Sequence, residues 1–433
     1  MRWTRRDLIT TGALVGGAHL ARAASDRIRV AVVGMGGRSR DHIREMSKIP
    51  GVELACFCDP DTTQMERRAA EFTKLGGTPP TLQQDLRRVL DDRSIDVVTI
   101  ASCNHWHALS AIWALQAGKH VYVEKPVCHD MFSGRQMVAA ARKYGRLAQG
   151  GTQRRSSGTV QRGIQALREG VIGDLYMARC VHYQKRNALE VREAEEAPST
   201  LNWDLWLGPA PKQAFRRNLQ PYNWHWFWDF GNGELGNNGV HFIDIARWGL
   251  NKRLPSRINS IGGRFGYKDQ GQTPNTELST FQFEDGTELV VEIRGRYSNR
   301  DGDFTSGVIF YGSKGYMTVD VRDRCAVYIE GRDTAEPELP GMDAAKQTSG
   351  GAATRAHFQN YFAALRANTP SLLAADIEEG YLSTAFCLLG NISYRLNRGL
   401  RFDPGTQRFT GDDEANRMLR NKYRAPFTIP DRV

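Results

Sequence analysis

The chain has 433 residues, a length that favours two or three domains and excludes a peptide-sized or disulfide-stapled module. Hydrophobic residues make up 40% and charged residues 24%, with 43 Gly against 17 Pro, which is the composition of a folded α/β protein and excludes intrinsic disorder. The formal net charge of +10 raises the question of nucleic-acid binding, but the basic residues are scattered, with no run beyond pairs such as Arg154-Arg155. We therefore expect a solvated basic surface and no nucleic-acid partner.

The first 23 residues have the layout of a removable export signal. Arg5 and Arg6 precede an apolar stretch, residues 8–20, and Ala21-Arg22-Ala23 then supplies a small-x-small end that suits a signal peptidase. This stretch is too short to cross a bilayer core of about 30 Å, so no stable membrane anchor is expected. Paired arginines before a weakly hydrophobic core are typical of twin-arginine signals, and we predict export, to the periplasm or beyond, through the twin-arginine machinery. The alternative is an ordinary secretory signal.

A dinucleotide-binding pattern follows. Residues 28–33 are apolar and rich in β-branched side chains, which predicts a strand, and the glycine turn after it, Gly34 to Arg38, opens a predicted helix over residues 38–48. The free N–H groups at the start of that helix could hold a pyrophosphate. A second predicted strand, residues 52–58, ends in Asp59, at a spacing that suits a carboxylate on the adenosine ribose.

Two details qualify this pattern. Ser39 stands where a third glycine is usual, so a purely structural turn is the alternative. Asp59 is followed by Pro60 and Asp61, without an adjacent Arg or Lys, so a 2′-phosphate would meet repulsion. NAD is therefore predicted over NADP.

Strand and helix patterns continue to alternate up to residue 150. Helices are predicted over residues 61–75, 82–90 and 106–117, and strands over residues 96–101 and 120–123, which together predict a doubly wound parallel sheet, a Rossmann domain, over residues 26–150. Ligands of such sheets bind beyond the carboxyl ends of the strands. The polar side chains after two strands are thus expected to border the cofactor, namely Ser102, Asn104 and His107 after one, and Glu124 and Lys125 after the other.

Neither the cysteines nor the histidines form a ligand pattern. The seven Cys are odd in number and contain no CxxC pair, so no disulfide framework is predicted. His105 and His107 flank Trp106, but a zinc site would need further ligands at suitable spacing. No metal is predicted.

Several segments together resemble one family. The Gly34 turn, Asn104-His105-Trp106-His107, Glu124-Lys125-Pro126 and the later residues 236–244 occur in the order seen in the glucose-fructose oxidoreductase, inositol dehydrogenase and MocA (Gfo/Idh/MocA) family. The resemblance implies a C-terminal α+β domain, residues 151–403, with a large open, mainly antiparallel sheet that forms the wall of the substrate site and commonly the dimer interface. A homo-oligomer is therefore expected, and residues 404–433 are interpreted as a surface tail.

The resemblance also implies the cofactor and its contacts. It places a nicotinamide dinucleotide, NAD, on the N-terminal domain. The residues expected to bind it are Gly34, Met35, Gly36, Gly37, Arg38, Asp59, Ser102, Asn104, His107, Glu124, Lys125 and Gln153.

Lys125 is the first candidate for catalysis. The family's matching lysine lies near the nicotinamide and the reacting carbinol, and crowding there should lower its pKa toward a range that suits proton transfer. The alternative is a lysine that binds only the ribose. Glu124 is expected to orient the backbone or the cofactor.

His241 and Asp244 are three positions apart in an apolar stretch, so on a helix they share one face. Four positions before His241, where the family often has an acid, this chain has Asn237, an amide that can bind a hydroxyl but cannot act as a base. We therefore predict Lys125 and His241 as the proton-transfer pair, with Asp244 setting the tautomer or binding a substrate hydroxyl. A structural histidine on a packed helix is the alternative.

Aromatic residues are dense over residues 222–230, which hold three of the nine Trp. Trp224 and Trp226 could stack on the C–H faces of a sugar, and Tyr183, at the end of a predicted strand, is placed with them and Asn237 as a substrate residue. A packed loop at the domain junction is the alternative.

The resulting prediction is an exported NAD-dependent oxidoreductase that acts on a sugar or cyclitol hydroxyl and holds its cofactor tightly, because free NAD is scarce outside the cytoplasm. The alternative is an NAD-dependent glycoside hydrolase that works by transient oxidation, elimination, hydration and re-reduction. A third possibility is a noncatalytic binding or scaffold protein that keeps the fold.

Overall fold

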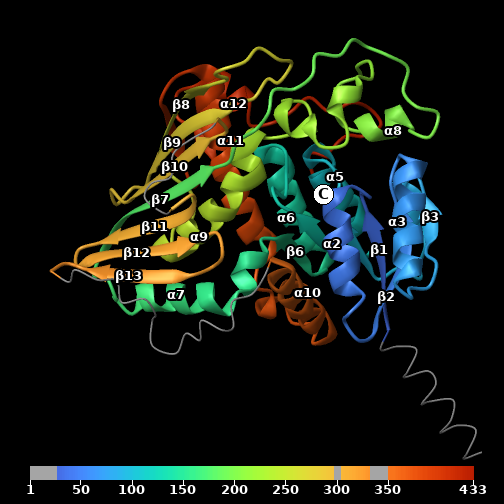
Figure 1. Cartoon of the computed structure of the whole chain (residues 1–433), viewed down its shortest axis with the longest axis horizontal. Helices are drawn as coiled ribbons and strands as arrows, with labels where there is room; N and C mark the ends of the chain where they lie inside the picture. The colour runs from blue at the N-terminus through green and yellow to red at the C-terminus, as the bar shows by residue number, and fades with distance from the viewer. Residues whose placement is uncertain (1–26, 297–303, 332–349) are drawn as a thin grey trace, which may run out of the picture.

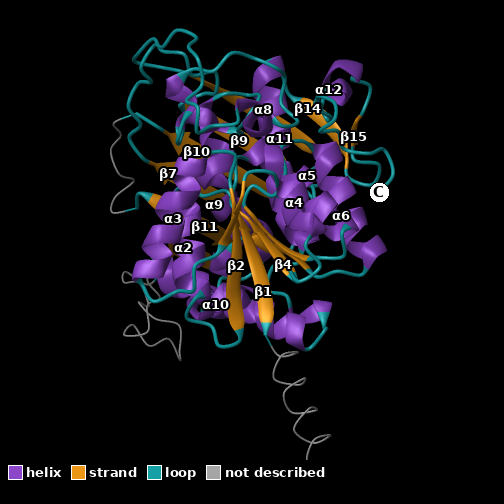
Figure 2. Cartoon of the chain, turned by 90° about the vertical axis from the view of Figure 1, so that its right-hand side faces the viewer, coloured by secondary structure: helices purple, strands orange, loops and turns teal. Residues whose placement is uncertain are grey.

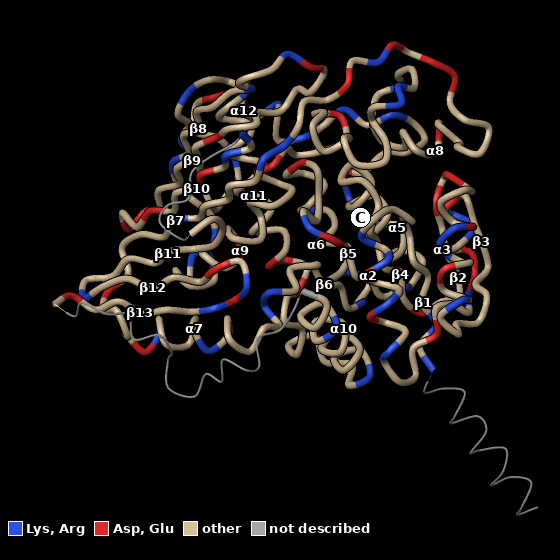
Figure 3. Tube along the Cα trace, in the orientation of Figure 1, with Lys and Arg blue, Asp and Glu red and all other residues tan. Residues whose placement is uncertain are grey.

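The computed structural model describes residues 27–296, 304–331 and 350–433 of the chain. The predicted export signal, residues 1–23, lies outside them. Within the described ranges no helix is both long and apolar enough to cross a membrane. The fold contains two large sheets (Figure 1), and acidic and basic residues are interspersed over both halves of the molecule (Figure 3).

The N-terminal sheet has six strands in the order β3-β2-β1-β4-β5-β6, all paired in parallel. The strands are β1 (Ile28–Val33), β2 (Val52–Cys58), β3 (Thr81–Gln83), β4 (Val97–Ile100), β5 (His120–Glu124) and β6 (Ala148–Gly151). The helices are α2 (Gly37–Met46), α3 (Thr62–Lys74), α4 (Leu86–Asp91), α5 (Asn104–Gln116) and α6 (Met131–Tyr144) (Figure 2). Strand β4 is buried along its whole length because helices cover both faces of the sheet. The predicted Rossmann sheet is confirmed.

One predicted helix differs from the structure. The sequence predicts a helix over residues 82–90, whereas residues 81–83 form strand β3 and helix α4 begins only at Leu86. Asp85 caps this helix, since its carboxylate accepts a hydrogen bond from the Arg87 N–H at 3.0 Å. The segment before the cap is therefore free to extend along β2 as an edge strand.

The C-terminal sheet has nine strands in the order β13-β12-β11-β7-β10-β9-β8-β14-β15. Only β7 and β10 pair in parallel, so the sheet is mixed and mainly antiparallel, as predicted. The strands are β7 (Leu175–Tyr183), β8 (Arg257–Gly263), β9 (Thr276–Gln282), β10 (Glu288–Arg294), β11 (Ser306–Gly312), β12 (Gly315–Asp320), β13 (Cys325–Ile329), β14 (Leu400–Asp403) and β15 (Arg408–Phe409).

Helices cover one face of this sheet and join it to the Rossmann domain. Helix α9 (Val240–Leu250) packs on β7 and β11, and helix α11 (Ile377–Leu396) contacts β8 on one side and α6 on the other (Figure 1). Residues of both sheets and of these helices belong to one continuous apolar core. Helix α10 (Gly350–Arg366) returns to the Rossmann domain, where Phe358, Tyr361 and Phe362 pack in the cluster that contains β1 and β2 residues. The remaining helices are α7 (Gly158–Arg168), α8 (Trp203–Leu207) and α12 (Asp413–Arg417).

The prediction of a surface tail over residues 404–433 is wrong. Phe409, Leu419, Phe427 and Ile429 are buried in the main core, and Phe427 lies edge-on to Trp106 of the Rossmann domain with ring centroids 5.5 Å apart. The segment is polar on average, but its few apolar residues all turn inward. Composition alone does not show that arrangement.

Candidate active site

A glycine turn at the end of β1 forms one wall of the main pocket. Gly34 has φ 87°, and a Cβ there would lie 2.5 Å from the backbone nitrogen of Ser102, so only glycine fits. A Cβ on Gly36 or Gly37 would meet nothing within 4 Å. Because α2 begins at Gly37, its free N–H groups point toward this open space. The turn therefore fits the pyrophosphate of a dinucleotide.

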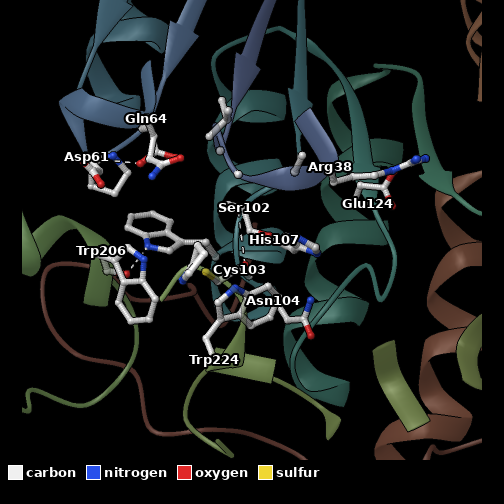
Figure 4. Close-up of a pocket in the computed structure, with 18 of the residues that line it drawn as sticks. Arg38, Asp61, Gln64, Ser102, Cys103, Asn104, His107, Glu124, Trp206 and Trp224 are labelled. Carbon is white, nitrogen blue, oxygen red and sulfur yellow. Dashed lines mark hydrogen bonds and ion pairs between the residues drawn. The ribbon is translucent and has the colours of Figure 1, made fainter. Parts of the chain in front are cut away.

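The pocket has a volume of about 440 Å³ and lies between the carboxyl ends of the Rossmann strands and the segment from Leu205 to Asn237 (Figure 4). Many of the predicted site residues line it: Gly34, Gly36, Gly37, Arg38, Asp59, Ser102, Asn104, His107, Glu124, Lys125, Trp224 and Asn237. Others do not: Met35, Gln153, Tyr183, Trp226, His241 and Asp244. The first set brings the expected cofactor contacts together with Lys125.

Asp59 is fixed at the end of β2. Its carboxylate accepts hydrogen bonds from the N–H of Met35 at 2.6 Å and from the N–H of Asp61 at 2.9 Å. Burial raises the pKa of Asp59 to about 6, although these two N–H groups act in the opposite direction. Met35 contributes its backbone to this arrangement, while its side chain is buried in the core. Asp61 and Asp85 also line the pocket, so this end of it repels a 2′-phosphate and suits the ribose of NAD.

Glu124 neutralises Arg38 at the other end of the glycine turn. The Arg38 Nε donates to Glu124 at 2.8 Å (Figure 4). His42 Nε2 lies 2.8 Å from the same carboxylate oxygen. Burial disfavours the charged carboxylate, but Arg38 and His42 outweigh burial and hold the pKa of Glu124 well below its ordinary value. Its second oxygen accepts the Lys125 N–H at 3.2 Å. Glu124 thus orients the backbone at Lys125 and takes no proton.

The Lys125 ammonium is the one lysine group that faces the pocket among the residues that the structure describes. Its Nζ donates to the backbone oxygen of Asn237 at 2.6 Å. Burial lowers the pKa of Lys125 below 10.5, and the nearby Glu124 opposes this shift only in part. A lysine in such surroundings is suited to exchange a proton with a substrate hydroxyl.

Asn237 lies in a π-helical turn, Leu235–Gly239, that leads into α9. Such turns are frequent at functional sites because they re-aim side chains out of the helical register. The Asn237 Nδ2 donates to the Tyr222 hydroxyl at 2.8 Å and to Glu234 at 3.4 Å. Asn237 therefore holds Lys125 through its backbone and Tyr222 through its side chain.

Glu234 is a buried carboxylate that the sequence analysis missed. It is 3% exposed and accepts hydrogen bonds from Arg186 at 2.8 and 2.9 Å, and from Asn238. Burial acts to raise the pKa of Glu234, but His182 and Arg186 lower it to about 2. Its place, one helical turn before the Asn that replaces the family's acid, was the signal that could have identified it.

Asp244 does not act on His241, and the predicted role for it is wrong. Both Asp244 oxygens accept from the Arg155 Nε, at 3.0 and 2.8 Å, and one also accepts from the Ser383 hydroxyl at 2.6 Å. His241 Nδ1 is buried without a hydrogen-bond partner among the described residues. Burial, reinforced by Lys125, holds the pKa of His241 well below 6.5, so the ring is neutral. Its part in proton transfer stays a prediction.

Three further residues lie elsewhere than predicted. Tyr183 points to the sheet face opposite α9, where its hydroxyl donates to Glu292 at 3.1 Å, whereas its neighbour His182 stacks on Phe242 of α9. Trp226 packs in a buried aromatic cluster with Trp206 and Phe230. Gln153, just after β6, does not reach the pocket. The contacts of Tyr183 and Trp226 therefore do not support their substrate assignments, and the cofactor assignment of Gln153 stays a prediction.

The described residues contain no group of three or more His, Cys, Asp or Glu that could hold a metal ion. All seven cysteines lie in the described ranges, and none is in a disulfide.

Two family models match the chain. A model described as an oxidoreductase family with an NAD-binding Rossmann fold matches residues 28–152, and a model of the family's C-terminal α/β domain matches residues 181–429. The two matches correspond to the two sheets of the structure.

Among curated relatives, the inositol 2-dehydrogenase/D-chiro-inositol 3-dehydrogenase of Shouchella clausii is 31% identical over 163 residues, 37% of this chain and 46% of that protein. A glycosyl hydrolase family 109 protein of Shewanella putrefaciens is 34% identical over 122 residues, 27% of each chain. The chain thus matches less than half the length of these relatives.

Solved structures show the same fold at low identity. A levoglucosan dehydrogenase in complex with NADH has a TM-score of 0.68 at 18% identity and covers 86% of this chain and 98% of its own. The WlbA dehydrogenase of Bordetella pertussis, in complex with NADH and UDP-GlcNAcA, has a TM-score of 0.65 at 19% identity and covers 87% and 99%.

Proposed function

Since the chain belongs to the Gfo/Idh/MocA oxidoreductase family and has its NAD-binding Rossmann domain, we propose that it transfers hydride at a hydroxyl-bearing carbon of a sugar or cyclitol. One observation carries the proposal. Lys125 lies in the same pocket as the glycine turn and Asp59, with its ammonium held by Asn237 and its pKa lowered. The sugar dehydrogenases and inositol dehydrogenases among the similar proteins support this substrate class.

Several pocket residues have a part in the proposed reaction. Gly34, Gly36 and the start of α2 bind the pyrophosphate, and Asp59 binds the adenosine ribose. NAD, when bound, supplies the hydride acceptor. Lys125 removes the hydroxyl proton from the carbinol and returns it in the reverse direction. The Trp224 ring, which stacks on His225 with centroids 3.6 Å apart, gives the pocket a flat apolar wall for the C–H face of a sugar.

A strap formed by residues 197–208 supports tight retention of the cofactor. The Thr62 N–H donates to the Thr200 oxygen at 3.0 Å, and the Asn202 N–H donates to the Pro60 oxygen at 2.9 Å, so the strap is tied to the segment just after Asp59. Trp206 of the strap lines the adenosine side of the pocket. We propose that the cofactor is bound before the predicted export and is released only slowly.

The test begins with protein purified after export. Its absorbance is recorded for bound nicotinamide, and free sugars and aryl glycosides are then supplied while aglycone release and the reduced-cofactor band are followed. Cofactor reduction without aglycone release is the expected result. Aglycone release without net reduction would overturn the proposal in favour of the hydrolase described next.

Lys125→Met provides the matched variant. We expect it to lower turnover by about 10²- to 10⁴-fold, because it removes the proton-transfer group. Bound NAD is measured alongside, and turnover is expressed per molecule that holds NAD, since Lys125 is also an expected cofactor contact. In the wild type, the rate should rise with pH as Lys125 loses its proton, with a midpoint below 10.5. A variant that keeps full turnover would exclude Lys125 as the base.

A second candidate function is NAD-dependent glycoside hydrolysis. The similarity to glycosyl hydrolase family 109 proteins favours it, as does a strap that would keep the cofactor in place between cycles. Oxidation of a sugar hydroxyl acidifies the neighbouring C–H, the aglycone is eliminated, water adds, and the ketone is reduced again. The net reaction is hydrolysis, and it does not need the carboxylate pair of ordinary glycosidases.

A further inference from the structure

The Tyr222 hydroxyl has a free hydrogen at the mouth of the pocket. Its oxygen accepts from the Asn237 Nδ2 at 2.8 Å, and no acceptor for its own hydrogen is found among the described residues. The guanidinium of Arg186, 5.8 Å from the centre of the ring, is a donor only. Burial raises the pKa of Tyr222 above 10.0, so the group keeps its proton near neutral pH. Tyr222 lines the pocket together with Lys125.

The orientation of Asn237 is fixed by Glu234. A carboxylate only accepts hydrogen bonds, so Glu234 holds the Nδ2 end of the amide, which lies 3.4 Å away. Rotation of the amide would turn its oxygen toward this buried anion. Glu234 is itself held by the two hydrogen bonds from Arg186. Asn237 therefore acts as the donor in both hydrogen bonds, to Glu234 and to the Tyr222 oxygen.

Asn237 also brings Tyr222 and Lys125 together. Its backbone oxygen accepts from Lys125 at 2.6 Å, and its side chain donates to Tyr222 at 2.8 Å. A single residue therefore holds both groups, and both line the same pocket. Lys125 is a proton acceptor once it is neutral, and the Tyr222 hydroxyl is a hydrogen-bond donor.

We propose that Tyr222 binds an oxygen on the carbon next to the reacting carbinol, and that Glu234 is the positioning residue that aims it through Asn237. The inference rests on the proposed function and deepens it. The site then requires a polyol with an oxygen substituent beside the carbon that is oxidised, and it discriminates against analogues that lack this oxygen.

Binding calorimetry tests this inference without turnover. The probes are D-glucose, D-galactose and myo-inositol, with analogues of each that are deoxygenated at single carbons. For the polyol that binds, Tyr222→Phe should weaken the affinity by about 3- to 10-fold, the range of one net hydrogen bond, while leaving the melting temperature and bound NAD unchanged. The same variant should no longer distinguish the polyol from one deoxy analogue. Tyr144→Phe, which changes a tyrosine outside the pocket, is the matched control.

Glu234→Gln should reproduce the loss seen with Tyr222→Phe, and the double variant should lose little more, because both changes break one chain of hydrogen bonds. Glu66→Gln, at an exposed position on α3, controls for the change in charge. If Glu234→Gln does not fold, Asn237→Asp removes the same donor from Tyr222.

The outcomes separate this inference from the proposed function. Unchanged affinity in Tyr222→Phe, or equal losses for the polyol and all its deoxy analogues, would overturn the inference alone. Binding that depends on Tyr222 and on one oxygen of the polyol, without hydride transfer, would overturn the proposed function and leave only the contact between Tyr222 and that oxygen. A wild-type protein that binds none of the polyols would overturn both.

Discussion

Glu277 on β9 is a buried carboxyl group outside the pocket, and no ion pair of the described residues includes it. In the part of the chain that the structure describes, the carboxyl group of Glu277 has one hydrogen-bond partner, the Ser279 hydroxyl, which donates to it at 3.1 Å. Burial raises the pKa of Glu277 from 4.5 to about 7, and Ser279 offsets this only in part. Between about pH 4.5 and pH 7, the folded protein therefore keeps a proton on Glu277 that the unfolded chain has already released.

Glu277 should make the unfolding free energy of the protein depend on pH. The folded pKa lies above the unfolded one, so the contribution of Glu277 is fully present below 4.5 and is lost as pH rises toward 7. At about 1.4 kcal/mol per pH unit, the loss amounts to at most about 3.5 kcal/mol. Glu277→Gln should flatten this part of the curve of unfolding free energy against pH, measured with urea, while Glu66→Gln keeps the wild-type slope. Identical slopes in both variants would show that Glu277 ionises normally.

At the scale of elements, the junction between β1 and α2 depends on one close approach of backbones. Gly34 and Gly76 have nearly equal positive φ values, 87° and 86°, but only at Gly34 would a Cβ collide with another segment. Gly34→Ala should therefore abolish NAD binding, whereas Gly76→Ala carries the conformational cost without the collision and should retain it. Fluorescence titration with NADH measures both. Equal affinities in the two variants would contradict the assigned cradle.

Asp244 connects three structural elements and does not line the pocket. Arg155 follows β6, Asp244 is on α9 and Ser383 is on α11, and both charged groups are almost fully buried. Asp244→Asn removes the more deeply buried of the two carboxylates that pair with the Arg155 guanidinium and leaves Glu379, at 3.2 Å, so we expect a loss of about 1.5 to 3 kcal/mol in unfolding free energy. Thermal and urea denaturation measure it, with bound NAD as a check that the pocket persists. A loss below about 1 kcal/mol would contradict this role.

Elements that depend on local patterns were predicted, and contacts between distant segments were not. The Rossmann half is specified by strand, glycine turn and helix within a few residues of one another. Tyr183 could be placed only by knowing which face of β7 is covered by helices. The alternation of side chains along a strand defines two faces but does not show which of them is buried. The partner of Asp244 is 89 positions away. Glu234 was overlooked because its role depends on Arg186 and Tyr222, which the fold alone brings to it.

At the scale of the whole molecule, the sheet face opposite α9 carries exposed apolar side chains among the described residues. Ile261 and Tyr176 are each 55% exposed on this sheet, and Tyr316 is 38% exposed. Large apolar side chains exposed on a sheet face are one feature of interaction surfaces. Together with the resemblance that implies a dimer interface on this sheet, they support the proposal that two copies pair here.

Light scattering tests this proposal. The purified protein should have a molar mass of at least twice that of one chain, which is 48.6 kDa for all 433 residues and less once the predicted signal is removed. Ile261→Lys with Tyr316→Lys should reduce the mass to that of a single chain. Leu75→Lys, at a position 76% exposed on the Rossmann half, is the control and should leave the mass unchanged. A wild-type mass of one chain would exclude the pairing.

The strap over residues 197–208 also bears on how the protein matures. Its sequence is synthesised after the whole Rossmann domain, and its hydrogen bonds to Pro60 and Thr62 close the adenosine side of the pocket late. A nascent chain therefore has an interval in which the nucleotide site is complete and still open. If the protein is exported as proposed, NAD must bind during that interval. A chain that folds in cells depleted of NAD would be exported without the cofactor and could not acquire it outside the cytoplasm, where free NAD is scarce.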